Sequence, residues 1–376
     1  MDYWLINNLL TLGLAILLTG IIIPKILTIA FRKNLFDKVD ARKIHHGAIP
    51  RLGGIAFVPS IIFAVLLTVG IGLKFNSEAM LKVLGPAIVP VLFLVCALML
   101  LFLIGIADDL IGVSYNSKFA VQILCAVLML VSGVRIDNLY GFLGLHELPL
   151  WLSYLGTALL VVFIVNAINL IDGIDGLCSG LSAICLFCYG TLFILTGQYL
   201  YSMISWATFG CLVPFFYFNI FGDVNRRRKI FMGDTGSLSI GMVLVFLSVE
   251  ATRVGMHVPM LEGVNPLIVA YAPLMLPMFD VVRVFNHRIQ KHRNPFTPDK
   301  CHIHHKLMAM GIVPRKTLAV ILLVTTVWLV FNIVLSPYVN VNLLVGGDVA
   351  IWMIANLLLT HVIRNREKRL NRELYD

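Results

Sequence analysis

Side chains with polar oxygens recur at three-residue intervals in one segment of the chain. They are Asn166, Asn169, Asp172 and Asp175. If the backbone is helical there, positions 166, 169 and 172 lie near one face. Gly173 and Gly176 would break that helix and let a ligand approach backbone N–H groups. Because amide and carboxylate oxygens are hard ligands suited to Mg²⁺, the segment predicts a site for a divalent cation beside a ligand.

Two further motifs carry carboxylates. The sequence Phe-Met-Gly-Asp-Thr-Gly-Ser at 231–237 places Asp234 in a second glycine turn, directly after four consecutive basic residues. Cations beside a metal-binding carboxylate suit a diphosphate, although a basic run also marks an inner membrane surface. Phe231 has the shape to stack on a planar base; packing at the membrane interface is the alternative. Asp108 and Asp109 are neighbours, and helix neighbours face different ways, so we expect one to point into a site and the other to support it.

Two basic segments supply candidate contacts for phosphate or sugar. Arg51 lies in a Pro-Arg-Leu-Gly-Gly turn at 50–54. A longer segment at 283–316 carries the candidates Arg293, His302, His304 and His305. Two of these histidines, His302 and His305, have a spacing that could bind a metal on a helix, but neighbouring arginines disfavour a cation. We therefore favour readers of phosphate or sugar, with a zinc site as the alternative.

The elements that position these residues must lie in a membrane. Of the 376 residues, 59% are apolar and only 13% are charged, whereas ordinary soluble domains carry about 25% charged residues. The mean hydropathy is +0.91. Such a composition excludes a cytosolic enzyme, a secreted disulfide scaffold and a nucleic-acid reader, so we expect no nucleic-acid partner. Most of the surface must instead contact membrane lipid.

Eleven apolar segments are long enough, or nearly so, to span a bilayer. They are 4–30, 52–73, 83–107, 119–134, 150–170, 177–198, 201–221, 236–251, 264–285, 317–338 and 342–363. The fourth is short, and the ninth contains three prolines, which predict a bent helix. The fold expected is therefore an all-α, polytopic membrane bundle of about eleven helices, forming a single domain over 1–376 with 283–316 as a cytoplasmic loop inside it.

The basic residues set the orientation. With the N-terminus outside and the C-terminus inside, 24 Lys and Arg fall on inner connections and 4 on outer ones, as the positive-inside rule requires. The candidate acids then gather at inner helix ends. Acids in a helical bundle also suggest an ion or metal transporter, but transporters place such groups near the bilayer midplane. A structural scaffold would not need several acidic glycine turns on one face.

These motifs resemble those of the polyprenyl-phosphate N-acetylhexosamine-1-phosphate transferase family. The resemblance rests on Asn-Ala-Ile-Asn-Leu-Ile-Asp-Gly-Ile-Asp-Gly-Leu at 166–177 and on four shorter motifs at 50–54, 108–109, 231–237 and 298–305. All occur in the family's order, on the inner side. The single Ile within His-Ile-His-His resembles the branch that uses N-acetylglucosamine. The resemblance implies transfer of N-acetylglucosamine 1-phosphate from a UDP-sugar to undecaprenyl phosphate at the cytoplasmic face of a bacterial inner membrane, for synthesis of a surface glycan such as O-antigen.

The resemblance also implies roles for residues. Asp234 and Asn169 are expected to bind Mg²⁺, with Mn²⁺ as a substitute, and Asp108, Asp109 and Asp172 are expected to be catalytic. The remaining candidates are expected to bind substrate: Arg51, Asn166, Asp175, Gly176, Phe231, Arg293, His302, His304 and His305. A homodimer is plausible for such a protein. Another UDP-N-acetyl sugar, UDP-N-acetylmuramoyl-pentapeptide, and a covalent two-step mechanism all stay open as alternatives.

Overall fold

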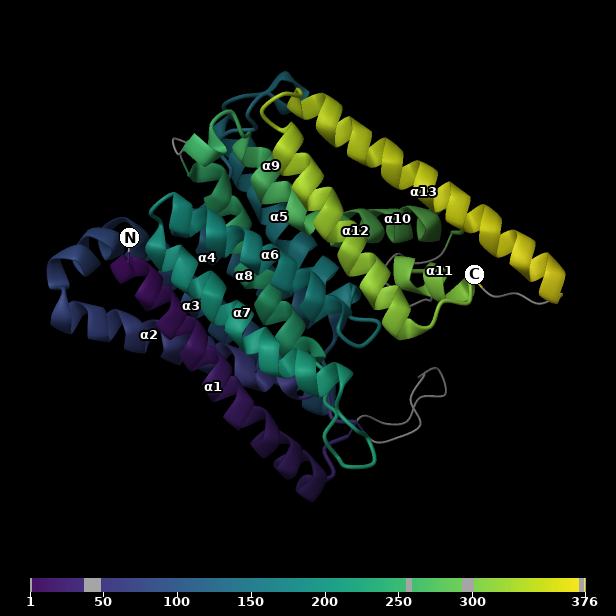
Figure 1. The fold of residues 1–376 in the computed structure, drawn as a ribbon, viewed down its shortest axis with the longest axis horizontal. Coiled ribbons are helices and arrows are strands. Elements are labelled where there is room, and N and C mark those ends of the chain that lie inside the picture. The colour runs from purple at the N-terminus through teal and green to yellow at the C-terminus, as the bar shows by residue number, and fades with distance from the viewer. Residues whose placement is uncertain (1, 37–48, 255–258, 293–300, 372–374, 376) are drawn as a thin grey trace.

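The computed structural model describes residues 2–36, 49–254, 259–292, 301–371 and 375. Within these ranges the chain is almost entirely helical (Figure 1). The long helices are α1 (Asp2–Lys33), α2 (Phe57–Phe75), α3 (Ser77–Ile111), α4 (Tyr115–Val131), α5 (Leu150–Leu170), α6 (Leu177–Leu195), α7 (Tyr199–Ile220), α8 (Gly233–Arg253), α10 (Met275–Gln290), α12 (Pro314–Leu335) and α13 (Val341–Leu370). The short elements are η1 (Gly53–Ala56), η2 (Phe142–Gly144), η3 (Pro259–Leu261), α9 (Pro266–Tyr271), η4 (Ala272–Leu274) and α11 (Ile303–Ala309).

The predicted multi-pass bundle is confirmed. In the described part of the chain, ten helical segments are long and apolar enough to cross a membrane, and α4 is a shorter apolar helix. Together they account for the eleven predicted segments. Helix α4 begins four residues earlier than predicted, because Ser114 caps it by accepting a hydrogen bond from the Ser117 N–H at 3.2 Å. That early start puts Lys118 on its first turn.

Helix α8 forms the centre of the bundle (Figure 1). The apolar stretch of α8 is completely buried inside the protein, and the helix packs mainly against α3 and α5. Small side chains allow this close packing: a Cβ on Gly241 would stand 2.9 Å from the Val165 Cα of α5. Small residues let helix backbones approach each other inside a membrane. The N-terminus of α8 is thereby fixed between its neighbours.

The ninth predicted span is broken, as its prolines predicted. Helix α9 gives way to η4 around Pro273, and α10 follows. Pro277 has no N–H to offer the Pro273 carbonyl, which accepts the Cys185 thiol at 3.1 Å instead. The Tyr189 hydroxyl donates to the Ala270 carbonyl at 2.6 Å. Side chains of α6 thus satisfy carbonyls at the break, which is how prolines are tolerated inside a bilayer.

The segment 283–316 is less of a loop than predicted. Helix α10 continues to Gln290, α11 covers Ile303–Ala309, and α12 already begins at Pro314. Proline suits the first turn of a helix, which explains the early start of α12. Basic and histidine side chains in the last turn of α10 favour its extension, because cations stabilise a helix C-terminus.

Candidate active site

Three carboxylates from two helices meet at one end of the bundle. Asp108 and Asp109 lie in the last turn of α3, and Asp234 lies in the first turn of α8. One oxygen from each falls within 4.8 Å of the others. Among the described residues, this is the one group of three or more acids, histidines or cysteines close enough together to hold a metal ion. Carboxylates this close repel each other unless a cation lies among them.

Lys118 supplies a positive charge to this cluster. Its Nζ lies 2.9 Å from Asp234 Oδ2 and 3.3 Å from Asp108 Oδ2. Sequence reasoning did not select Lys118. The sequence does carry one indication of its role, since Lys118 is the single basic residue of the inner connection 107–118, next to the Asp108–Asp109 pair. The lysine shows that the space between the two carboxylates accepts a cation.

Asp109 supports the site rather than facing it. Its Oδ1 accepts the Asp234 N–H at 2.8 Å, and its Oδ2 accepts the Thr235 N–H at 3.0 Å and the Thr235 hydroxyl at 2.6 Å. These bonds satisfy N–H groups that have no partner inside helix α8. Asp108 uses one oxygen to accept the Val113 N–H and turns the other to Lys118. One aspartate of the pair therefore faces the cluster and the other supports it, which is the arrangement expected for helix neighbours.

Glycines bring the start of α8 against its neighbours. A Cβ on Gly54 would lie 2.0 Å from the Gly236 nitrogen, and one on Gly105 would lie 2.4 Å from the Thr235 Cα. Gly233 has φ +73° and lies against the Arg51 carbonyl. Three backbone hydrogen bonds also join 50–54 to 231–232. The Pro-Arg-Leu-Gly-Gly turn is therefore part of the wall of the carboxylate cluster, and it brings Arg51 there.

The turn between α5 and α6 carries the predicted acid-glycine motif. Helix α5 ends at Leu170, so Asp172 does not continue the helical face of Asn166 and Asn169, contrary to the expectation. Asp172 is attracted electrostatically by Arg51 and repelled by the carboxylates of Asp234, Asp175 and Asp109. It therefore lies on the same side as the cluster, but on a turn.

The other residues of this turn are fixed by partners. The Lys229 Nζ lies 2.5 Å from Asp175 Oδ2, which brings the basic run at 226–229 to the motif. Gly176 has φ +78°, and its N–H donates to Asn219 Oδ1 at 2.6 Å. Phe231 is held through its backbone, since its N–H donates to the Pro50 carbonyl and its own carbonyl accepts the Gly53 N–H.

The two asparagines of α5 have different surroundings. Asn169 Nδ2 donates to Ser237 Oγ of α8 at 2.8 Å, and Asn169 also interacts with Asp234. Asn166, one turn earlier, exchanges hydrogen bonds with Gln122 of α4. Asn169 thus belongs to the carboxylate cluster, whereas the Asn166 amide joins α4 to α5.

The histidine segment reaches the same turn from the other side. His304 in α11 is 1% exposed and lies against Gly173, where a Cβ would stand 2.2 Å from its Nε2. Neither ring nitrogen of His304 has a hydrogen-bond partner among the described residues. Burial, assisted by His305, lowers the pKa of His304 to about 3, so its ring is neutral at pH 7. The turn therefore lies between the carboxylate cluster and a neutral imidazole.

The remaining histidines are placed as follows. His302 Nδ1 lies 2.7 Å from Asp280 Oδ2 of α10, a fully buried carboxylate that the sequence marks only as one of the acids at inner helix ends, without a specific role. The ring of His305 lies 4.1 Å from that of His304. Among the described residues, no third His, Cys, Asp or Glu ligand lies within metal-binding distance of His302 and His305, so the geometry does not favour the zinc alternative. Arg293 lies outside the described residues.

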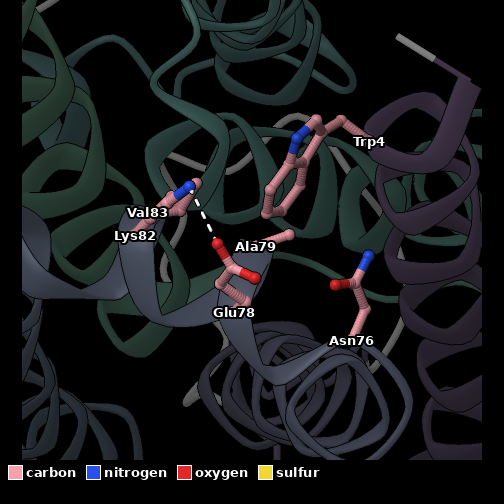
Figure 2. A pocket seen from close by; sticks show the side chains of 6 residues that line it. All are labelled: Trp4, Asn76, Glu78, Ala79, Lys82 and Val83. Carbon is pink, nitrogen blue, oxygen red and sulfur yellow. Dashed lines mark ion pairs between the residues drawn. The ribbon is translucent and has the colours of Figure 1, made fainter.

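A hollow elsewhere in the molecule has a different character. It has a volume of about 280 Å³ and is lined by Trp4, Asn76, Glu78, Ala79, Lys82 and Val83 (Figure 2). Its charged pair, Glu78 and Lys82, is an exposed ion pair within the first turns of α3. The carboxylate cluster lies at the other end of this helix, roughly 45 Å away at 1.5 Å per residue. The hollow is therefore no part of the site.

Fold and site together define a class. The chain is a multi-pass membrane protein whose acids, cations and neutral imidazole converge at helix ends and glycine turns, the arrangement expected for transfer of a phosphoryl group between anionic molecules.

Comparison with known proteins places the chain within that class. Residues 91–252 match the model of glycosyl transferase family 4. Undecaprenyl-phosphate alpha-N-acetylglucosaminyl 1-phosphate transferase of Salmonella typhi is 31% identical over 301 residues, which is 80% of this chain and 76% of that protein. The Yersinia pestis protein of the same name is 30% identical over 78% of this chain and 75% of its own length. A probable undecaprenyl-phosphate N-acetylglucosaminyl 1-phosphate transferase of Bacillus subtilis is 31% identical over 89% of this chain and 87% of its own.

This chain therefore belongs to glycosyl transferase family 4, among the polyprenyl-phosphate sugar-1-phosphate transferases.

Proposed function

We propose that this protein transfers N-acetylglucosamine 1-phosphate from UDP-N-acetylglucosamine to undecaprenyl phosphate. UMP leaves, and a lipid-linked sugar diphosphate remains for synthesis of a surface glycan. The names of the relatives support this donor and acceptor. The observation that carries the proposal is the carboxylate cluster of Asp108, Asp109 and Asp234, joined to His304 through the turn at Gly173.

The cluster suits a hard divalent cation. It offers carboxylate oxygens from Asp108 and Asp234 with Asn169 beside them, and it already accepts the Lys118 ammonium. Mg²⁺, or Mn²⁺ in its place, would be held by these residues and would neutralise charge on the diphosphate. Asp109 would hold the start of α8, and hence Asp234, in place.

The reaction joins two anions, so charge and positioning dominate its barrier. An oxygen of the lipid phosphate attacks the β-phosphorus of the UDP-sugar, and the bond from that phosphorus to the oxygen of UMP breaks. Lys118, Arg51 and Lys229 bring positive charge around the cluster and the acidic turn. Neutral His304 can hydrogen-bond the donor without adding charge. Asp175 lies on the turn where we place the uracil, and we assign stacking on the base to Phe231, two residues after the Asp175 partner Lys229.

No strong base is required for this attack. A phosphate monoester has a second pKa near ~6, so the acceptor is largely a dianion at neutral pH. We therefore favour a single displacement. For a covalent phospho-aspartate, Asp108 is the better candidate: both oxygens of Asp109 accept hydrogen bonds from the α8 backbone, whereas Asp108 Oδ2 has only the long 3.3 Å contact with Lys118. Accumulation of phosphorylated protein with UDP-sugar alone would exclude the single displacement.

The proposal includes a location. The asymmetry of 24 inner to 4 outer basic residues supports a site on the cytoplasmic face of the bacterial inner membrane. A homodimer is also proposed, on the resemblance alone.

The test follows UMP release from purified protein with undecaprenyl phosphate and Mg²⁺. UDP-N-acetylglucosamine and UDP-N-acetylmuramoyl-pentapeptide are supplied separately. We expect UMP from the first donor only, and none after Asp234→Asn. Asp223→Asn is the matched control, because Asp223 lies in the preceding exposed loop and its contact with the Asn225 N–H survives the change. UMP from the second donor alone would refute the assignment of the sugar, and no UMP from either would refute the proposal.

A further inference from the structure

A residue beyond the end of α13 returns to the histidine segment. The Tyr375 hydroxyl donates to the Cys301 carbonyl at 2.5 Å and accepts from Arg283 Nη1 at 3.2 Å. Its backbone N–H donates to Glu367 Oε1 of α13 at 3.0 Å. Tyr375 thus connects α13, α10 and the residue that precedes the histidines.

Arg283 passes this connection to His302. Its Nη2 donates to Asp280 Oδ1 at 2.9 Å and also to the Cys301 carbonyl. Asp280 in turn accepts the Ile303 N–H at 3.0 Å and lies 2.7 Å from His302 Nδ1. A buried carboxylate is stable only when its partners are held in place. The series Tyr375, Arg283, Asp280 and His302 therefore fixes the start of α11.

Helix α13 holds the other end of α11. Lys306 is 5% exposed and donates to Asn356 Oδ1 at 3.2 Å and Thr360 Oγ1 at 3.0 Å. Its Nζ lies 5.6 Å from the centre of the Tyr375 ring. Arg366 of α13 donates to the Ala309 carbonyl at 2.9 Å. Tyr375 and the inner end of α13 thus hold α11 at its start, middle and end.

The position of α11 matters because it carries His304. That ring lies directly against Gly173, with no hydrogen bond of its own among the described residues to keep it there. Any shift of α11 therefore moves His304 relative to the turn between α5 and α6.

We propose that Tyr375 is a positioning residue for the sugar-nucleotide donor: its hydroxyl closes the network from Arg283 through Asp280 to His302 and so sets His304 against the turn at Gly173. This inference rests on the proposed function for the identity of the donor. It predicts that Tyr375 acts on donor binding and not on the acceptor lipid or the chemical step.

The test compares Tyr375→Phe, which removes only the hydroxyl, with Lys368→Ala, a control at an exposed position of α13. Loss of a hydrogen bond between partly buried groups costs about 1 kcal/mol. We therefore expect a roughly fivefold rise in KM for UDP-N-acetylglucosamine in Tyr375→Phe, with kcat and the KM for undecaprenyl phosphate within about twofold of the unchanged protein. The control should match the unchanged protein in all three constants.

A second readout does not depend on activity. Cys301 is completely buried under Tyr375, and the other six cysteines lie in membrane-spanning helices or in α4. We expect the Cys301 thiol of Tyr375→Ala to react with a membrane-impermeant maleimide in inverted vesicles, and that of the unchanged protein to be protected. Cys301→Ser gives the background.

Equal falls in kcat and in affinity for both substrates would mean general destabilisation and would overturn the inference. So would an unchanged donor KM, or a Cys301 that stays protected in Tyr375→Ala. If UDP-N-acetylglucosamine is not a substrate at all, the labelling still decides whether Tyr375 holds the segment, so the two failures are distinguishable.

Discussion

Changing either of the two neighbouring aspartates at the end of α3 to asparagine should have different effects: one change should lower stability and the other should lower activity. Asp109 accepts three hydrogen bonds from the start of α8, two of them from Thr235. In Asp109→Asn one oxygen becomes an NH₂ group, which faces donors. With the amide oxygen toward Thr235, the bond from the Asp234 N–H is lost outright, which costs about 1.5–3 kcal/mol. The bonds from Thr235 lose their charge assistance, and the negative charge at the helix N-terminus is lost as well. We expect a destabilisation of about 3 kcal/mol or more.

Asp108→Asn should leave the fold intact. Its remaining oxygen can still accept the Val113 N–H. The weakened contact with Lys118 is offset by relief of repulsion from Asp234. Activity, however, should fall roughly 100-fold or more, because one of the carboxylates that would hold the divalent cation against the diphosphate is removed.

The assay pairs thermal unfolding in detergent, followed by intrinsic fluorescence, with UMP release. At about 2–4 °C per kcal/mol, Asp109→Asn should lower Tm by roughly 6–12 °C or more. Asp108→Asn should stay within ~2 °C of the unchanged protein, as should the control Asp223→Asn. An unchanged Tm for Asp109→Asn, or equal losses of Tm in both variants, would refute the division of roles.

Three further changes test other parts of the site. Lys118→Met removes the ammonium between Asp108 and Asp234, so Mn²⁺ titrated by paramagnetic resonance should bind more tightly while UMP release falls; weaker Mn²⁺ binding would contradict this. Gly54→Ala should lower Tm sharply, since its Cβ would lie 2.0 Å from a backbone nitrogen, whereas Gly85→Ala, with nothing within 4 Å, should not. The pKa of His304 is about 3 in the folded protein and about 6.5 in the unfolded chain. The unfolded chain therefore takes up a proton at this group below about pH 6.5, and the free energy of unfolding declines as the pH falls. Between pH 7.5 and 5.5 this group alone lowers the free energy of unfolding by about 1.4 kcal/mol. His304→Gln should show a smaller drop in Tm over that interval, and an equal drop would exclude His304 as the cause.

The fold could be predicted because a bilayer leaves few options for an apolar chain. Hydropathy located the spanning helices, and the prolines at 266, 273 and 277 located the broken one. The predicted helix ends are less accurate than the predicted spans where a capping side chain sets the end, as Ser114 does for α4. Hydropathy predicts a loop at 283–316 because the helices within this segment are too polar to resemble membrane spans.

The site was predictable in its residue types but not in its pairings. The spacing of Asn166 and Asn169 predicts a shared helix face. Tertiary packing, however, decides that Asn166 hydrogen-bonds Gln122 and Asn169 hydrogen-bonds Ser237. The sequence does not single out Lys118, because a lone lysine after an apolar helix is ordinary at an inner membrane surface. The role of Asp280 depends on His302, 22 residues away. Such contacts are set by how helices pack, and no local pattern encodes them.

A buried acid of α13 bears on the transporter alternative. A carboxylate inside a membrane marks an ion path by default, and Asp348 of α13 is 2% exposed. It is, however, already supplied with donors: Trp328 Nε1 at 2.5 Å, Asn332 Nδ2 at 3.1 Å and the Tyr271 hydroxyl at 3.2 Å. These donors come from α12 and α9, so Asp348 joins three helices and has little capacity left to bind an ion. The acids that share a single lysine lie instead at the ends of α3 and α8, where a water-soluble donor and a lipid phosphate can meet, and that placement favours a transferase.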